Sequence, residues 1–146
     1  MTANLLEVQG LKMYFPVLGG VLRHKVAEAR AVDGVSFAIP PGATLGLVGE
    51  SGCGKTTVAR ALLRLYTPTD GTVRFDGRDV GRMGREALRR LRREMQMIFQ
   101  DPFESLNSRQ TVRDILEEPF RIHREAPDAK ARERAVEGLL ERVGLP

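Results

Sequence analysis

The pattern of apolar and polar positions divides the chain into a first part with the features of strands and a second part with the features of helices. In the first part, apolar residues alternate with polar ones or form short continuous runs, as in half-buried and fully buried strands. The predicted strands are residues 5–8, 35–39, 44–48, 73–75 and 95–99. The continuous run at 44–48 is typical of a central strand covered on both faces, whereas the strand at 73–75, followed by an Asp-Gly turn, is typical of an edge hairpin.

Helical spacing begins at Lys55 and returns later in the chain. The first helix carries Val58, Ala61, Leu62 and Leu65, and we expect Pro and Gly at residues 67–71 to stop it. A basic helix follows the turn at residues 76–77. Thr111 and Asp114 predict a capping box that opens a helix ending at Pro119.

The last predicted element is a longer helix opened by Pro127 and Asp128. Gly144 ends it, and its apolar face consists of Val136, Leu139, Leu140 and Val143. These patterns predict an α/β fold in which residues 1–104 form a core subdomain and residues 105–146 begin a helical subdomain.

The strongest chemical signal lies between the predicted strand at 44–48 and the helix that follows it. Residues 49–56, GESGCGKT, satisfy the phosphate-binding pattern G-x-x-x-x-G-K-[ST] in the strand-loop-helix context that the pattern requires. Glycines let the loop curl so that its N–H groups approach a polyanion, and the start of a helix adds unpaired N–H groups and positive dipole charge. The match in this context predicts a P-loop nucleoside triphosphatase (NTPase). The alternative is that the glycines merely form a tight turn and that Lys55 is solvated.

Each residue type in the loop suits one part of a nucleotide. Lys55 supplies a mobile charge for the β- and γ-phosphates, Thr56 offers Mg²⁺ a hard oxygen ligand, and Thr57 can bond the α-phosphate. The predicted ATP contacts in the loop are Gly49, Glu50, Ser51, Gly52, Cys53, Gly54, Lys55, Thr56 and Thr57.

Composition narrows the function classes. Hydrophobic residues make up 42% of the 146 residues and charged residues 29%, as in a folded domain. We expect a cytoplasmic protein, since the sequence has neither a run of about 20 apolar residues nor a signal peptide. Cys53 is the only cysteine, so zinc is not supported. It is interpreted as a small filler, with an oxidation-sensitive thiol as the alternative.

Net charge is +4, and six arginines lie between Arg82 and Arg93. The segment predicts either an exposed helix face or a patch for nucleic acid or anionic membrane. Without interleaved aromatic residues for base stacking, an exposed helix face is the favoured interpretation, and no nucleic-acid partner is expected.

Two longer stretches extend the P-loop into a family resemblance. Residues 31–65, AVDGVSFAIPPGATLGLVGESGCGKTTVARALLRL, and residues 97–112, MIFQDPFESLNSRQTV, resemble the ATP-binding subunits of ABC importers for oligopeptides and dipeptides. The resemblance covers nearly the whole chain and implies an ABC-type nucleotide-binding domain, with a mixed sheet that has antiparallel edge strands.

The resemblance also assigns residues outside the loop. It implies that Gln100 begins a Q-loop that touches Mg²⁺ or the attacking water, which makes Gln100 and Lys55 the catalytic candidates and Thr56 and Gln100 the metal ligands. It implies that Phe15 stacks on adenine, with Tyr14 as the alternative residue. Core packing of either ring is the competing interpretation.

The same resemblance implies partners and a location. The complete protein is expected to hydrolyse ATP as a dimer with a second ATP-binding subunit, bound to transmembrane permease subunits on the inner face of the cell membrane. The family's signature loop, Walker B strand and switch histidine do not occur before Pro146, so residues 1–146 are expected to bind ATP without turnover. The alternatives are an importer of nickel or another small solute, a non-transport ABC ATPase of the DNA-repair type, and a binding module without ATPase activity.

Overall fold

The structure is a computed structural model that describes residues 4–19, 24–99 and 106–145. It consists of two compact units, Met1–Met97 and Ile98–Pro146. The expected boundary between residues 104 and 105 falls among residues outside the described ranges, and it remains an expectation.

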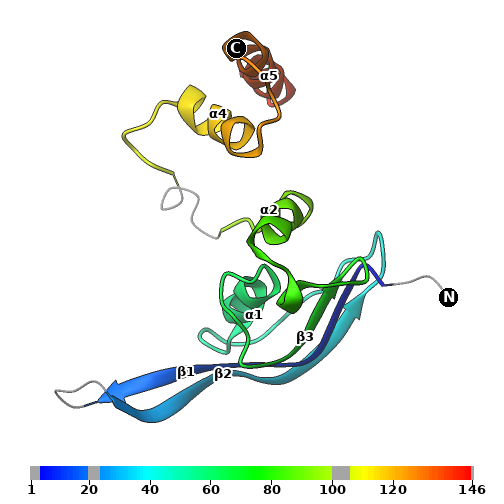
Figure 1. Cartoon of the computed structure of the whole chain (residues 1–146), viewed down its shortest axis with the longest axis vertical. Coiled ribbons are helices and arrows are strands. Elements are labelled where there is room, and N and C mark those ends of the chain that lie inside the picture. The colour runs from blue at the N-terminus through cyan, green and yellow to red at the C-terminus, as the bar shows by residue number, and fades with distance from the viewer. Residues whose placement is uncertain (1–3, 20–23, 100–105, 146) are drawn as a thin grey trace. The chain divides into compact units, whose positions relative to one another are not determined.

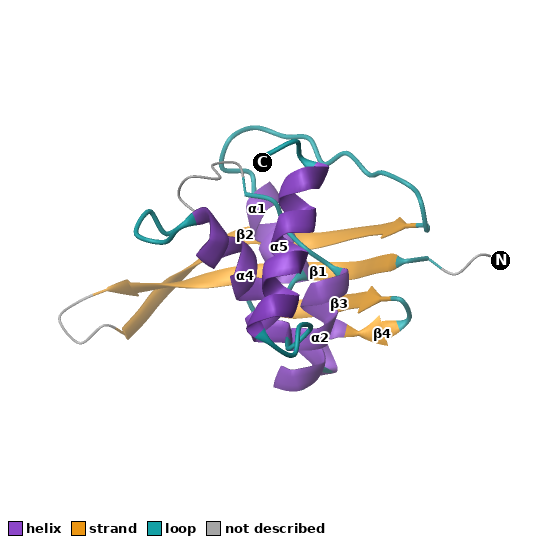
Figure 2. Cartoon of the chain, turned by 90° about the horizontal axis from the view of Figure 1, so that it is seen from above, coloured by secondary structure: helices purple, strands orange, loops and turns teal. Residues whose placement is uncertain are grey.

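The first unit is built on a four-stranded sheet in the order β2-β1-β3-β4 (Figures 1 and 2). Its strands are β1 (Leu6–Gly19), β2 (His24–Ile39), β3 (Asp70–Phe75) and β4 (Arg78–Asp79). All pairings among the described residues are antiparallel. The predicted strands at 35–39 and 73–75 are confirmed as the last parts of β2 and β3.

The first strand is much longer than the predicted residues 5–8. Gly10 adopts a left-handed φ of 57°, and the register with β2 shifts between Val8 and Leu11. Ser36 Oγ accepts a hydrogen bond of 2.8 Å from the Gly10 N–H. Gly10, which would interrupt a regular strand, therefore forms a β-bulge, and the pairing of β1 with β2 continues to Gly19.

The predictions of strands at 44–48 and 95–99 are wrong for this structure, which leaves both segments unpaired. Val48 is 94% exposed and Ile98 is 96% exposed. A strand exists only through hydrogen bonds to a neighbour. The described part of the chain supplies no neighbour to either segment, so apolar character alone does not make them strands.

Helix α1 (Lys55–Leu62) ends one turn before the predicted stop at residues 67–71. Arg64 has a left-handed φ of 49°, and its N–H donates to the Ala61 carbonyl at 2.9 Å. Its guanidinium donates to the carbonyls of Val80 and Met83. These contacts with residues far along the chain hold a non-glycine residue in the left-handed conformation that ends the helix. The residues next to Arg64 therefore contain no local signal, such as glycine, that would predict the end of α1.

The short 3₁₀ helix η1 (Val80–Arg82) and helix α2 (Arg85–Glu94) complete the first unit. Figure 1 shows α1 and α2 on the same face of the sheet. The buried apolar residues between these layers are Leu6, Val8, Leu11, Met13, Val32, Val58, Ala61, Val73, Phe75, Val80 and Leu91. This core fixes the start of α1 against β2, which is where the predicted loop lies.

The second unit contains helices α4 (Val112–His123) and α5 (Ala129–Arg142). The capping box of Thr111 and Asp114 is confirmed, and the Asp128 side chain accepts a hydrogen bond from the Ala131 N–H at 2.8 Å. The predicted end of the first helix at Pro119 is wrong, since α4 continues to His123.

Ion pairs on both sides of the proline account for this difference. Glu117 Oε1 lies 2.9 Å from Arg113 Nε, and Glu117 Oε2 lies 2.7 Å from Arg121 Nη2. Pairs at this i,i+4 spacing stabilise a helix, and here they link the turns before and after Pro119. A proline in a helix costs one N–H donor, and flanking contacts of this kind oppose that cost.

The apolar face predicted for the last helix is only partly buried. Val136 is 4% exposed, whereas Leu139 is 37% exposed and Val143, which lies beyond the last turn, is 70% exposed. Gly144, with φ of 73°, ends the element as predicted. None of the helices among the described residues is long and apolar enough to cross a bilayer.

Candidate functional site

The glycine-rich loop curls through two left-handed residues. Gly52 has φ of 83° and Gly54 has φ of 97°, both in the region that glycine adopts without strain. The Cys53 N–H donates to the Glu50 carbonyl at 3.3 Å, which closes a turn. The loop thereby delivers Gly54 to the N-cap position of α1.

Gly54 also approaches another strand too closely for any other residue. A Cβ atom on Gly54 would lie 2.2 Å from the Ala31 carbonyl oxygen in β2, far inside van der Waals contact. A Cβ on Gly49 would lie 2.6 Å from Cys53 Sγ. The glycine pattern therefore serves tertiary fit as well as the curl of the loop.

The Lys55 ammonium group folds back into the loop. Lys55 Nζ donates to the Gly49 carbonyl at 2.7 Å and to the Glu50 carbonyl at 2.6 Å, and it lies 3.4 Å from Cys53 Sγ. A full positive charge is thus placed within the concave side of the loop, where its own carbonyls hold it.

The first turn of α1 presents backbone donors at the same place. Among the described residues, none supplies a side-chain hydrogen bond that caps this helix at Gly54. The first intrahelical bond is from the Val58 N–H to the Gly54 carbonyl at 2.9 Å, which leaves the N–H groups of residues 55–57 unpaired within the helix. Thr56 is exposed and Thr57 is half-buried. The helix dipole of α1, its unpaired N–H groups and the Lys55 ammonium all favour an anion at the start of α1.

An open pocket of about 190 Å³ lies beside the loop. Its walls come from β2, from the segment before the loop and from the start of α1: Ala31, Val32, Asp33, Val35, Leu47, Val48, Cys53, Gly54, Lys55 and Val58. The pocket is mainly apolar, with Lys55 as its positive group. The sequence did not predict that β2 forms part of the pocket wall, because the position of β2 depends on its pairing with β1.

Phe15 lies in β1 and is packed against the edge of the core. Its ring meets Tyr66 in a T-shaped contact, with centroids 5.4 Å apart and an interplanar angle of 85°. Phe15 is half-buried. The predicted partner for a base therefore has an aromatic neighbour from the turn after α1, which sequence reasoning did not identify.

Tyr14, the alternative residue, faces a different set of groups. Its hydroxyl donates to Asp33 Oδ1 at 2.5 Å, and the Arg30 guanidinium lies 5.3 Å from its ring centroid. The hydrogen bond to Asp33 raises the pKa of Tyr14. One face of this ring is occupied by a cation, so Phe15 is the better placed of the two for stacking.

The remaining predicted site residue, Gln100, lies outside the described residues. Among the residues that are described, no group of three or more His, Cys, Asp or Glu side chains is placed to hold a metal ion. Cys53 is exposed on the loop.

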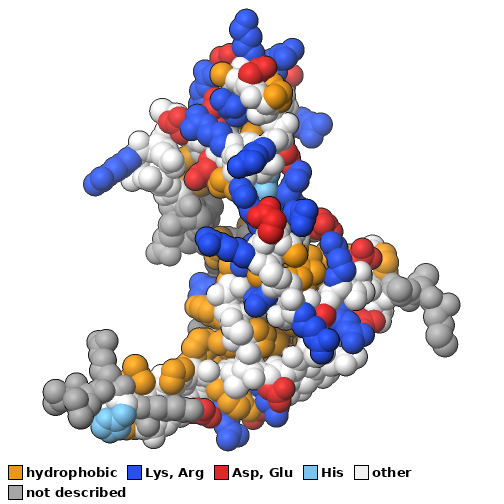
Figure 3. Space-filling view, viewed as in Figure 1, with side chains coloured by type: hydrophobic (Ala, Val, Ile, Leu, Met, Phe, Trp, Pro, Cys, Tyr) orange, Lys and Arg blue, Asp and Glu red, His pale blue; other side chains and the backbone are white. Residues whose placement is uncertain are grey.

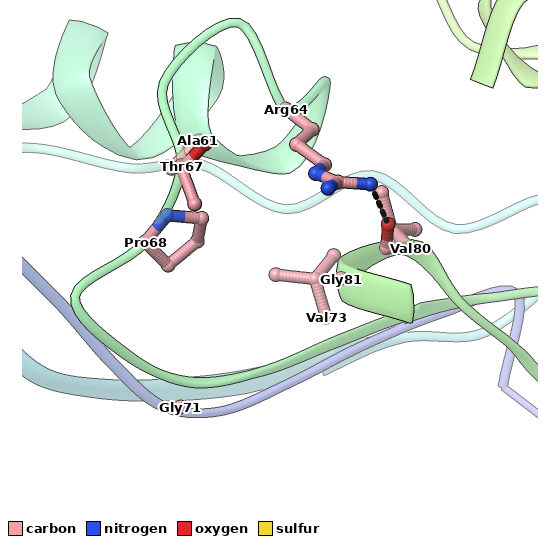
Figure 4. Close-up of a pocket in the computed structure, with 8 residues that line it drawn as sticks. All are labelled: Ala61, Arg64, Thr67, Pro68, Gly71, Val73, Val80 and Gly81. Carbon is pink, nitrogen blue, oxygen red and sulfur yellow. Dashed lines mark hydrogen bonds between the residues drawn. The ribbon is translucent and has the colours of Figure 1, made fainter. Parts of the chain in front are cut away.

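A second pocket, of about 140 Å³, lies between the end of α1 and β3 (Figure 4). Its lining includes the buried side chains of Ala61, Val73 and Val80, and the Arg64 guanidinium donates to the Val80 carbonyl at 3.3 Å. None of the predicted site residues lines it, so it is not part of the P-loop site.

Comparisons with known proteins show which family the chain resembles. The family described as "ABC transporter" matches residues 32–146. The oligopeptide transport ATP-binding protein AppF of Bacillus subtilis is 49% identical over 143 residues, which are 97% of this chain and 43% of AppF. OppF of the same organism is 51% identical over 146 residues, covering 99% of this chain and 46% of OppF.

A third relative and a solved structure extend the comparison. The glutathione import ATP-binding protein GsiA of Escherichia coli is 47% identical over 97% of this chain and 22% of GsiA. The dimeric ATP-binding cassette MJ0796 bound to ADP and Pi has a TM-score of 0.72 at 21% identity, over 93% of this chain and 56% of that one, which shows a shared fold.

The chain spans less than half the length of these curated relatives. The resemblance to oligopeptide importer ATP-binding subunits and the ABC-type α/β fold class are both confirmed. The chain belongs to the ABC transporter family.

Proposed function

We propose that the loop at residues 49–57 holds the phosphates of MgATP and that the complete protein hydrolyses ATP to drive import of peptides. The position of the Lys55 ammonium, 2.7 and 2.6 Å from the Gly49 and Glu50 carbonyls, carries the proposal. It places a mobile cation beside the open N–H groups of α1 in a pocket shaped by glycine. A triphosphate offers this ammonium stronger, charged acceptors than two neutral carbonyls.

Roles within the loop follow from position. Lys55 bonds the β- and γ-phosphate oxygens, Thr57 bonds the α-phosphate, and the remaining contacts come from backbone N–H groups between Gly49 and Lys55. The exposed Thr56 hydroxyl suits Mg²⁺, which prefers hard oxygen ligands and keeps much of its shell as water and phosphate. Gln100 is the second protein ligand proposed. When bound, Mg²⁺ neutralises phosphate charge.

Phe15 is proposed to stack on adenine. Its ring is half-buried rather than fully enclosed, and Tyr66 contacts it in a T-shaped arrangement that an offset base could extend. Base stacking on an aromatic ring is worth about 1 to 3 kcal/mol in nucleic-acid systems.

Nucleotide binding is tested by titrating Mg²⁺ with fluorescent ATP into the chain and into Lys55→Ala. We expect affinity to fall about 10- to 100-fold, the value of a charge-assisted hydrogen bond or two. Lys130→Ala, which removes an exposed lysine on α5, is the matched control and should bind as the parent does. Equal binding by the Lys55→Ala variant would overturn the site.

Hydrolysis and transport are proposed for the complete protein. The proposal is supported by relatives named as oligopeptide transport ATP-binding proteins. The proposed partners are permease subunits in the membrane and a second ATP-binding subunit, with the protein cytoplasmic and peripheral on the inner face of the membrane.

Residues 1–146 should bind ATP without sustained turnover, because phosphoryl transfer requires further positioned groups that the loop and Gln100 do not supply. Steady phosphate release from this chain, abolished by Lys55→Ala, would contradict that expectation. For the complete protein, reconstitution with its permeases should give peptide uptake that depends on ATP.

A further inference from the structure

The positive charge of this chain is concentrated in one segment. Residues 78–94 contain seven arginines and three acidic residues, an excess of four positive charges that equals the net charge of the whole chain. The other residues together are therefore electrically balanced. In the space-filling view, Lys and Arg side chains gather over the part of the first unit that carries α2 (Figure 3).

Some of these arginines have structural roles inside the first unit. Arg92 donates to the carbonyls of Leu63 and Arg64 at 3.3 and 3.0 Å, which ties α2 to the end of α1. Arg78 Nη2 lies 2.6 Å from Glu94 Oε2.

Four other arginines of α2 are exposed and form a surface that we call the arginine face: Arg85, Arg89, Arg90 and Arg93. At about 100° per residue, Arg89, Arg90 and Arg93 lie about 100° or more around the helix from both Leu91, which is 0% exposed, and the half-buried Leu88. Arg85 lies at the flank, about 60° from Leu88. All four are exposed, as are the two acidic residues of α2: Glu86 lies among these arginines, and Glu94 lies at their edge, where it pairs with Arg78. The helix thus buries one apolar stripe and presents a net positive surface to solvent.

We propose that the arginine face binds the anionic headgroups of a phospholipid membrane. Clusters of four or more basic residues on an amphipathic helix are attracted to the negative surface of the cytoplasmic leaflet, at about 1 kcal/mol each. The guanidinium group also matches phosphate oxygens in a bidentate geometry. The inference rests on the proposed location beside a membrane but not on nucleotide binding.

Nucleic acid is the less favoured anion. Residues 78–94 contain no Phe, Tyr or Trp, so the surface has no ring on which bases could stack. The arginine face also lies on one short helix of 10 residues, Arg85–Glu94, and the phosphates of a membrane form a surface that such a helix can lie against.

Flotation of the chain with vesicles tests the proposal, because aggregated protein sediments whereas vesicle-bound protein rises. We expect binding to vesicles that contain phosphatidylglycerol and little binding to vesicles of phosphatidylcholine alone. Replacing Arg85, Arg89 and Arg90 by Ala should weaken binding to the phosphatidylglycerol vesicles on the order of 100-fold. Raising salt from about 0.1 M to about 1 M should have a similar effect, because the Debye length falls from about 10 Å to about 3 Å.

Two further variants separate charge from fold. Replacing Lys130, Arg134 and Arg142 by Ala removes the same charge from exposed positions of α5 and should leave vesicle binding within about twofold, since these residues are not part of the arginine face. Replacing Arg85, Arg89 and Arg90 by Lys keeps the charge and should retain most of the binding.

Three outcomes would overturn the proposal: equal binding to both kinds of vesicle, equal loss in the α5 variant, or displacement from vesicles by duplex DNA at a lower phosphate concentration than lipid. ATP binding requires no vesicles, and flotation requires no nucleotide. Failure of one proposal is therefore distinguishable from failure of the other.

Discussion

Two helices of this protein begin in opposite ways. α4 begins at Thr111, whose hydroxyl accepts from the Asp114 N–H at 3.1 Å while Asp114 Oδ2 accepts from the Thr111 N–H at 3.2 Å. α1 begins at Gly54, and no side chain among the described residues caps it. The sequence of α4 satisfies its own first turn, whereas α1 leaves its first N–H groups open.

The difference separates a helix start that its own side chains cap from one that we propose binds phosphate. An uncapped start is not sufficient, because α2 also begins at a glycine without a side-chain cap, in an extended conformation with φ of −71°. What distinguishes α1 is the curled loop before it and the Lys55 ammonium held within that loop. Open donors become a binding site only where the surrounding chain brings charge and shape to them.

Among the substitutions that test this comparison, Gly54→Ala should have the largest effect on stability and on ATP binding. The substitution forces a residue with a Cβ into φ of 97°, 2.2 Å from the Ala31 carbonyl oxygen. Strain and overpacking together predict a loss of about 3 kcal/mol or more from the first unit, and loss of ATP binding. Chemical denaturation and nucleotide titration measure the two effects.

Gly84→Ala is the matched control for that substitution. Gly84 also occupies an N-cap, but a Cβ there meets nothing within 4 Å and φ is negative. We expect a change within about 1 kcal/mol and unchanged ATP binding. Similar losses in both variants would show that glycine at α1 acts only as a helix cap.

Glu117→Gln tests how far α4 depends on the ion pairs of Glu117, which include one to Arg132 of α5 at 3.8 Å. The hydrogen bonds from Arg113 and Arg121 lower the pKa of Glu117 below its ordinary value of 4.5. A lowered pKa means that the pairs stabilise the fold above the unfolded pKa and that this contribution disappears as pH falls through the folded value. Protection of α4 against hydrogen exchange should therefore decrease as pH falls below about 4.5.

The Gln variant should lose that pH dependence and melt several degrees lower at neutral pH, because a nearly buried acceptor for two arginines is weakened. Glu118→Gln, at an exposed neighbouring position, is the control and should melt as the parent does. A Glu117→Gln variant with unchanged exchange in α4 would mean that packing on α5 alone holds the helix.

Thr111→Ala should have the smallest effect. Loss of an N-cap costs about 1 kcal/mol, and the fraying should stay within the first turn of α4. The pKa of Asp114, lowered chiefly by the Thr111 hydroxyl, should move back toward its ordinary value. Thr111→Ser keeps the hydroxyl and serves as control. If α4 melts entirely in the Ala variant, its start is less independent than the capping box indicates.

Local signals predicted what local chemistry decides. The P-loop with its helix, the hairpin after β3 and both helix starts of the second unit follow from side chains within a few positions of one another. The end of α1 at Arg64 did not follow, because contacts to Val80 and Met83, 16 and 19 positions away, stabilise a left-handed arginine. Likewise the edge contact of Phe15 with Tyr66 depends on how the turn after α1 packs.

By itself, the sequence determined the chemistry of the candidate site: which loop carries glycine, lysine and hydroxyl groups, and where a helix begins behind it. Only the tertiary structure decided that Gly54 must lack a side chain because of Ala31, that β2 walls the pocket, and that the apolar run at 44–48 remains unpaired. The reason is physical: a loop's hydrogen-bond donors are fixed by its own residues, whereas a strand, a close approach and a pocket wall exist only relative to another part of the chain.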